Sequence, residues 1–109
     1  MTMSSLRRTL RLLPVLASGL LCTLAHSQSA QELNTRALAA TCANCHGTDG
    51  RAVEGSGSAR LAGQSAGFII EQLQAFRSGS RPATVMHQLA KGYSDAQIRD
   101  LATYFSAQR

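Results

Sequence analysis

The stretch Cys42-Ala43-Asn44-Cys45-His46 decides how the rest of this sequence is interpreted. Two residues between the cysteines place both thiols on one side of a helical turn, and His46 can then turn its imidazole toward the same side. Attachment of a haem through two thioethers requires this arrangement, with the histidine as an axial ligand of the iron. The motif therefore predicts one covalently bound haem c, held by Cys42 and Cys45, with His46 as proximal ligand.

Three other uses of the cysteine pair fit the sequence less well. A disulfide would close a loop of only four residues, which is strained and stabilises little. A thioredoxin-like redox pair needs a βαβ setting, and no stretch alternates with the period of a strand. A zinc site could recruit His46 and His87 beside the cysteines, but the separation to His87 does not match ordinary zinc spacings.

The N-terminal segment has the three parts of a secretory signal peptide. Residues 1–11 are basic, residues 12–24 form an apolar run, and Ala25-His26-Ser27 offers small residues where a signal peptidase cleaves. The run is shorter than the roughly 20 apolar residues that span a membrane. Lipidation at Cys22 is disfavoured because small residues do not precede it. We therefore expect a signal peptide over 1–27, a mature domain over 28–109, and a periplasmic location.

Loss of this segment changes the charge and the size of the protein. Three of the 11 basic residues and none of the 6 acidic residues lie within 1–27, so the net charge falls from +5 to +2. The remaining basic residues form no cluster interleaved with aromatics, which argues against nucleic-acid binding. The mature domain lies near the size of about 70–80 residues at which a core alone is marginal, and a haem would add apolar bulk to that core.

The rest of the chain predicts an all-α domain with long loops. Ser29 to Glu32 reads as a capping box opening a helix with Leu33, Ala37, Leu38 and Thr41 on one side. Residues 47–63 are rich in Gly and Ser and read as a loop. A second helix is expected from Ser65 to Gly79 and Pro82, and its apolar face consists of Phe68, Ile69, Leu73 and Phe76. A short helical turn follows over 87–91. The last helix is capped at Ser94, and its apolar face consists of Ile98, Leu101, Ala102 and Phe105.

Met86 is the predicted sixth ligand of the iron. Met1 and Met3 leave with the signal peptide, so Met86 is the only thioether of the mature domain, and it follows a stretch stiffened by Pro82. His87 is the competing ligand and would give coordination by two histidines. Two axial side chains leave no open position for substrate or O₂, which favours an electron carrier over an enzyme or a gas-binding protein.

The sequence resembles the class I cytochrome c family over nearly all of the mature domain. The resemblance rests on Cys42 to Gly47, on Leu61-Ala62-Gly63-Gln64, on Met86 and on Leu101 to Phe105. It implies a small fold of helices and long loops wrapped around one haem, with the first and last helices crossing. In that crossing, Leu38 and Thr41 would meet Leu101, Tyr104 and Phe105.

A narrower resemblance covers Phe76 to Pro82 and Thr84 to Tyr93. These segments are similar to the haem subunit of flavocytochrome c sulfide dehydrogenase. The resemblance implies a flavoprotein partner that oxidises sulfide and passes electrons singly to the cytochrome. The alternatives are a freely diffusing carrier serving a terminal oxidase or another redox enzyme and, from a different class, a haem-based ligand sensor.

Several supporting roles also follow from the family resemblance. Members often carry a proline at the position of Ala59, whose carbonyl accepts a hydrogen bond from the proximal histidine. Alanine there, with Gly55 and Gly57 nearby, predicts a more mobile loop. Tyr93 or Thr84 is a candidate hydrogen-bond donor near the Met86 sulfur, with a place in the core as the alternative role of Tyr93. Candidates for pairing with haem propionates or for a docking rim are Arg51, Arg60, Arg77, Arg81 and Lys91.

Overall fold

The computed structural model describes residues 30–109 of the chain. The predicted signal peptide and the Ser29 cap lie outside the described residues. Residues 34–109 form one compact unit, and the described residues of the preceding unit, 30–33, are helical. No strand occurs over 30–109, which confirms the all-α prediction. Within the same range, no helix is long and apolar enough to cross a membrane.

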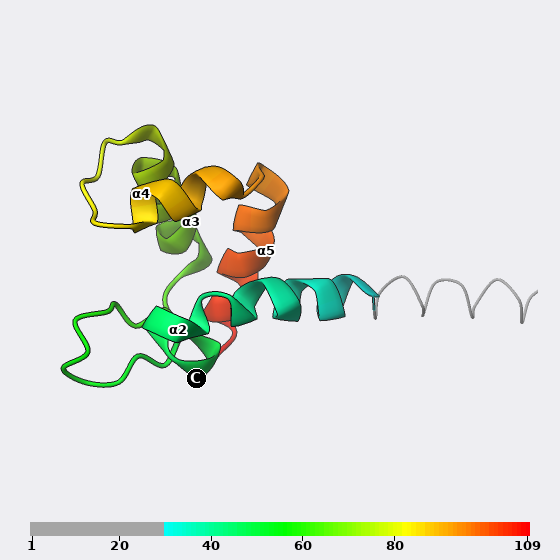
Figure 1. The fold of residues 1–109 in the computed structure, drawn as a ribbon. Helices are drawn as coiled ribbons and strands as arrows, with labels where there is room; N and C mark the ends of the chain where they lie inside the picture. The colour runs from blue at the N-terminus through cyan, green and yellow to red at the C-terminus, as the bar shows by residue number, and fades with distance from the viewer. Residues whose placement is uncertain (1–29) are drawn as a thin grey trace, which may run out of the picture. The chain divides into compact units, whose positions relative to one another are not determined.

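The helices are short and separated by loops, as Figure 1 shows. A helix over residues 30–40 leads into the cysteine motif, and the remaining elements, in chain order, are α2 (Ala43–His46), η1 (Thr48–Gly50), α3 (Ala66–Ser78), α4 (Met86–Leu89), η2 (Ala90–Gly92) and α5 (Asp95–Ser106). The helix α3 contacts α4, η2 and α5. The chain ends beside α2 (Figure 1), where the Arg51 Nε donates to the carbonyl of Arg109 at 2.6 Å.

The predicted helix ends are confirmed by their capping contacts. The Ser65 side chain accepts from the Phe68 amide at the start of α3. Gly79 ends that helix in the left-handed conformation with φ of 81°, where a residue without Cβ avoids a steric penalty. At the start of α5, Ser94 and Gln97 form both bonds of a capping box. Local sequence is therefore sufficient to set the bounds of α3 and α5.

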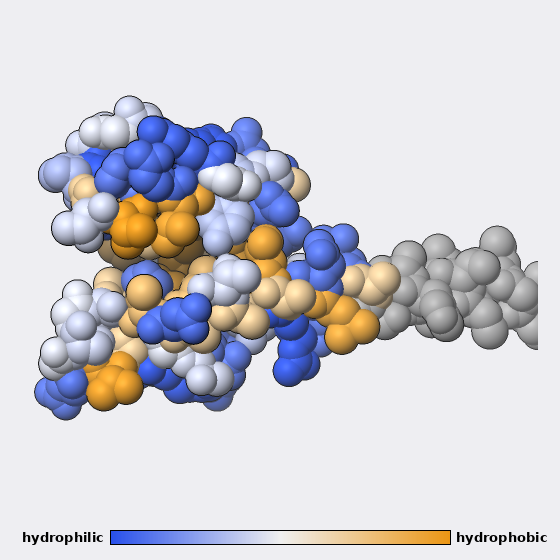
Figure 2. Space-filling view, viewed as in Figure 1, coloured by the Kyte–Doolittle hydropathy of each residue, from blue (hydrophilic) through white to orange (hydrophobic). Residues whose placement is uncertain are grey.

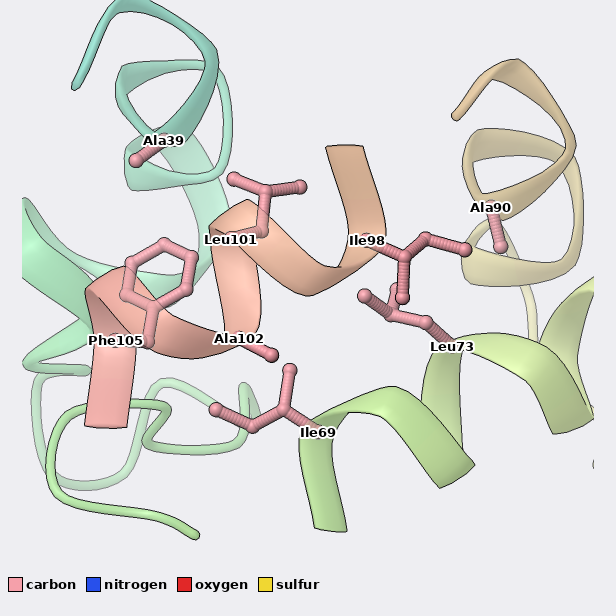
Figure 3. Close-up of a cluster of buried hydrophobic side chains, with 8 residues drawn as sticks. All are labelled: Ala39, Ile69, Leu73, Ala90, Ile98, Leu101, Ala102 and Phe105. Carbon is pink, nitrogen blue, oxygen red and sulfur yellow. The ribbon is translucent and has the colours of Figure 1, made fainter. Parts of the chain in front are cut away.

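The core centres on one face of α5. Figure 3 shows Ile98, Leu101, Ala102 and Phe105 pointing from this helix toward Ile69 and Leu73 of α3, Ala39 of the first helix and Ala90 of η2. All eight side chains are buried. The spacing i, i+3, i+4, i+7 along α5 produces one continuous apolar stripe, as predicted. This stripe joins the element that precedes the cysteine motif to the elements around Met86.

Two predicted helix faces differ from the structure. In the first helix, Leu38 and Ala39 face the core, whereas Ala37 and Thr41 are exposed. In α3, Phe68 is 47% exposed although its neighbour Ile69 is buried. Successive side chains of a helix point in directions about 100° apart around its axis. A prediction that is wrong by one position therefore assigns exposed residues to the buried face. Leu38 does pack against the core cluster, as the family resemblance implied, whereas the side chain of Thr41 is exposed.

Candidate functional site

The cysteine motif forms the tight turn that its spacing predicts. Cys42 precedes α2 and Cys45 lies within it, and the amides of Cys45 and His46 both donate to the Cys42 carbonyl at 3.3 and 2.9 Å. Both cysteines are free thiols. Burial raises the pKa of the Cys42 thiol, and hydrogen bonds with Thr41 and Tyr93 partly oppose that rise. Both thiols are free, so the pair is available for covalent attachment.

His46 is held by one short hydrogen bond to the following loop. Its Nδ1 lies 2.6 Å from the carbonyl oxygen of Ala59. A carbonyl can only accept, so Nδ1 carries the proton and Nε2 of the neutral ring keeps a free lone pair. This arrangement orients a metal-binding histidine. The bond to Ala59 that the family resemblance implied is therefore confirmed.

The turn after His46 contains an interaction that the sequence did not reveal. Asp49 accepts from the Tyr104 hydroxyl at 2.6 Å and from the Arg51 guanidinium at 3.0 Å. The first bond joins residues 55 positions apart. Asp49 comes just before Gly50 in a loop rich in small residues, where an aspartate is an ordinary turn residue. Nothing local in the sequence indicates that its partner is a tyrosine of the last helix.

Met86 lies on a different element from the other site residues. It is the first residue of α4, directly after Val85, rather than the last residue of the preceding loop. Its side chain is partly buried and packs against the core cluster. His87 follows it, and the Nδ1 of His87 is the one buried side-chain nitrogen or oxygen within residues 30–109 that has no hydrogen-bond partner. A buried polar atom without a partner is uncommon in a finished protein interior.

Tyr93 connects the segment around Met86 to the cysteine motif. Its hydroxyl lies 3.3 Å from Oγ1 of Thr41, the residue next to Cys42. Tyr93 is half-buried and packs against the core cluster. Arg77 of α3 donates to the Tyr93 carbonyl at 3.5 Å and forms an ion pair with Asp95 at 2.7 Å. Tyr93 thus links Thr41, beside the cysteine motif, to Arg77 of α3.

The surface between these segments has the character of a site for an apolar disc. Figure 2 shows this face hollowed between α4 and the α2 region, with apolar residues along both sides of the hollow. Near Met86, Val85 and Leu89 are 48% and 47% exposed. Two free thiols one turn apart, a histidine with a free Nε2 and a thioether on the opposite element are the donors that a haem c requires. The residues present fit this cofactor.

The basic residues proposed for the cofactor or for a docking rim mostly have contacts within the protein. Arg51 pairs with Asp49, Arg77 pairs with Asp95, and the Arg81 guanidinium lies 4.6 Å from the centroid of the Phe76 ring. Arg60 donates to the Ala62 carbonyl, and Lys91 is exposed. Their roles toward haem propionates or a partner remain predictions.

Comparison with known proteins agrees with this geometry. Residues 34–108 match the family described as Cytochrome c, which is most of the chain. The chain belongs to the cytochrome c family. Membership implies a covalently bound haem c and the role of an electron carrier, and it accounts for the cysteine pair directly before His46. The predictions of the family, the fold and the cofactor are thereby confirmed.

Proteins similar to this cytochrome c include a cytochrome c-552, a subunit of a sulfide dehydrogenase and a cytochrome c4. Cytochrome c-552 of Acidithiobacillus ferridurans is 48% identical over 61% of this chain and 28% of its own length. The cytochrome subunit of sulfide dehydrogenase of Chlorobaculum tepidum is 43% identical over 62% of this chain and 60% of its own length. The cytochrome c4 structure of Acidithiobacillus ferrooxidans matches with a TM-score of 0.57 and 45% identity, over 61% of this chain and 38% of that one. The chain spans less than two thirds of the length of each.

Proposed function

We propose that this cytochrome c is a periplasmic mono-haem carrier that accepts single electrons from a sulfide-oxidising flavoprotein subunit. In this proposal, Cys42 and Cys45 would hold the haem as thioethers, and His46 and Met86 would bind its iron. The observation that carries the proposal is the hydrogen bond from His46 Nδ1 to the Ala59 carbonyl at 2.6 Å, beside two free thiols. It leaves Nε2 as the one free nitrogen of a ring that is already oriented.

Each residue of the site contributes a separate part of the carrier function. Haem c, when bound, supplies an iron that gains or loses one electron. The two cysteines prevent loss of the cofactor, and His46 holds a fixed donor atom on one element. Met86 supplies a second donor from α4, and a thioether raises the reduction potential relative to coordination by two nitrogens. With His46 and Met86 both bound, the iron would offer no open position to a substrate.

The ligand assignment can be tested by carbon monoxide binding to the reduced holoprotein. We expect the wild type to bind carbon monoxide slowly or not at all, and Met86→Ala to bind it rapidly because one axial position becomes open. The matched variant His87→Ala should behave as the wild type. If His87→Ala opens the site and Met86→Ala does not, His87 is the sixth ligand. Rapid binding by the wild type would instead indicate a ligand sensor.

The proposed partner is supported by the resemblance of Phe76 to Pro82 and Thr84 to Tyr93 and by the named subunit among the relatives. The test is anaerobic reduction of the holoprotein by sulfide, with and without a flavoprotein encoded beside it. We expect a large acceleration by the flavoprotein. Equal rates with and without it would favour a freely diffusing carrier. Export and cleavage after Ser27 are tested by the N-terminal residue of the protein recovered from the periplasm.

A further inference from the structure

The turn that follows His46 contains a residue in an unfavourable backbone conformation. Asp49 has φ of 55° and is the one residue other than glycine with a positive φ within residues 30–109. The left-handed region is disfavoured for any residue with a Cβ, although aspartate tolerates it better than most. Such a conformation persists where the surrounding contacts hold it. The contacts of Asp49 therefore matter for the shape of this turn.

Three side chains, here called the Asp49 network, supply those contacts. They are Asp49, Arg51 and Tyr104, joined by the Tyr104 hydroxyl donating at 2.6 Å and the Arg51 guanidinium donating at 3.0 Å to the two carboxylate oxygens. Arg51 also donates from Nε to the Arg109 carbonyl at 2.6 Å. Hydrogen bonds to a charged acceptor are stronger than neutral ones. The network attaches the turn to the last helix and to the end of the chain.

Gly50, the residue after Asp49, is hydrogen-bonded to the base of the loop that contains Ala59. The Gly50 carbonyl accepts from the amides of Leu61 and Ala62 at 2.9 and 3.0 Å, which closes the base of the loop over 51–60. Gly50 is packed so closely that an added Cβ would lie 2.8 Å from the Leu61 Cβ and 2.9 Å from the Phe105 ring. Leu61 is two residues from Ala59, whose carbonyl accepts a hydrogen bond from the Nδ1 of His46. Asp49 is therefore connected to that carbonyl through Gly50 and the base of the loop.

We propose that Asp49 and Tyr104 are positioning residues that set the strength of the hydrogen bond from His46 to Ala59. The inference rests on the proposed role of His46 as proximal ligand. A strong bond from Nδ1 makes the ring a more basic donor, and a more basic donor stabilises the ferric over the ferrous state. Loosening the Asp49 network weakens this bond and raises the reduction potential.

The experiment compares Tyr104→Phe and Asp49→Asn with the wild type as holoproteins. Tyr104→Phe removes the donor hydroxyl, while Asp49→Asn keeps an oxygen acceptor and a residue type that accepts positive φ. We expect solvent exchange of the His46 Nδ1 proton, followed by NMR, to become about tenfold faster with loss of the charged hydrogen bond. We also expect the redox equilibrium to shift about threefold toward the ferrous state, which is about 28 mV at 59 mV per tenfold.

Two control variants remove similar groups elsewhere. Asp95→Asn breaks the ion pair with Arg77, and Ser106→Ala removes a hydroxyl that bonds within α5. Neither should change the His46 proton or the potential. If Tyr104→Phe and Asp49→Asn behave as these controls while the wild type is low-spin, the network serves stability alone and the proposal is wrong. If the wild type has no low-spin haem with His46 bound, the assignment of His46 fails instead, which is a distinct result.

Discussion

The segment around His46 and the segment around Met86 are held in different ways. The His46 segment, residues 42–62, is fixed by directional bonds: His46 to Ala59, Tyr104 to Asp49, and the Leu61 and Ala62 amides to Gly50. The Met86 segment, residues 66–93, is fixed mainly by apolar packing of α3 against α4, η2 and α5. It also contains the unpartnered His87 Nδ1 and the half-exposed Val85 and Leu89.

This difference indicates how the two candidate ligands are prepared. Directional hydrogen bonds specify an orientation, so the imidazole ring of His46 is oriented before any cofactor binds. Apolar packing specifies burial more than direction, and the face of α4 that carries Val85 and Leu89 is only partly covered. We therefore expect the Met86 segment to depend more on the haem for its final structure. Loss of the methionine ligand should be the first event when the protein is destabilised.

The largest expected effect comes from removing the side chain that both segments share. Phe105 is 2% exposed and packs in the core cluster, and its ring lies against the Gly50 turn. Phe105→Ala should lower the free energy of unfolding by about 3–5 kcal/mol, because it loses burial and leaves a cavity. Urea unfolding followed by circular dichroism measures the change. Phe68→Ala is the matched control and should cost much less, since Phe68 is half-exposed.

In urea unfolding of the wild-type holoprotein, the two segments should lose their structure at different urea concentrations. The absorbance band of ferric haem bound to a thioether reports the Met86 ligand, and the far-ultraviolet circular dichroism reports the helices. We expect the band to be lost at lower urea concentration than the helical signal, because the Met86 segment opens locally first. Coincident transitions would show that both segments unfold together and would contradict the comparison.

Removing the hydroxyl that connects the segments should have a smaller effect. Tyr93→Phe breaks the contact with Thr41 at 3.3 Å and should cost about 0.5–1.5 kcal/mol, the usual contribution of one hydrogen bond. We expect the thioether band to disappear at lower urea in this variant. Thr41→Val removes the other partner together with a bond to the Leu38 carbonyl at 2.7 Å, so adding Tyr93→Phe to Thr41→Val should cause no additional loss. Full additivity would mean that the two hydroxyls do not interact.

The pH dependence of stability should depend on the Asp49 carboxyl of the His46 segment. Hydrogen bonds from Tyr104 and then Arg51 lower the pKa of the Asp49 carboxyl below its ordinary value. A group whose folded pKa is lowered stabilises the fold above its unfolded pKa of about 3.9, and the contribution is lost as pH falls through the folded pKa. Asp49→Asn should therefore flatten the acid limb of the stability profile, measured by thermal unfolding. Asp95→Asn is the control with an intact network.

The smallest expected effect concerns the loop between Gly50 and Leu61, whose backbones are hydrogen-bonded to each other. Within residues 51–60, Gly55 and Gly57 have open space around them, and the ladder bonds of a helix are absent. Amides over 52–58 should exchange with solvent faster than those of α3 and α5. Ala59→Pro should slow this exchange, because proline restricts the chain. Protection in the loop equal to that of the helices would contradict the expected mobility.

The sequence by itself determined the features that depend on neighbouring residues. The cysteine spacing, the caps at Ser65 and Ser94, the stop at Gly79 and the apolar stripe of α5 all involve residues within one or two helical turns. The covalent haem and the all-α class follow from them, and the family comparison confirms both. Met86 is singled out by composition, since no other methionine lies in the predicted mature domain.

Only the tertiary structure decided the contacts between distant positions. The bond from Tyr104 to Asp49, the contact of Tyr93 with Thr41 and the exposure of Phe68 depend on how helices cross. The stripe of a helix predicts that it packs, but a shift of one residue turns each side chain by about 100° and changes its partner. For that reason the haem motif is evident in the sequence, whereas the bond from Tyr104 to Asp49 appears only once α5 is in place.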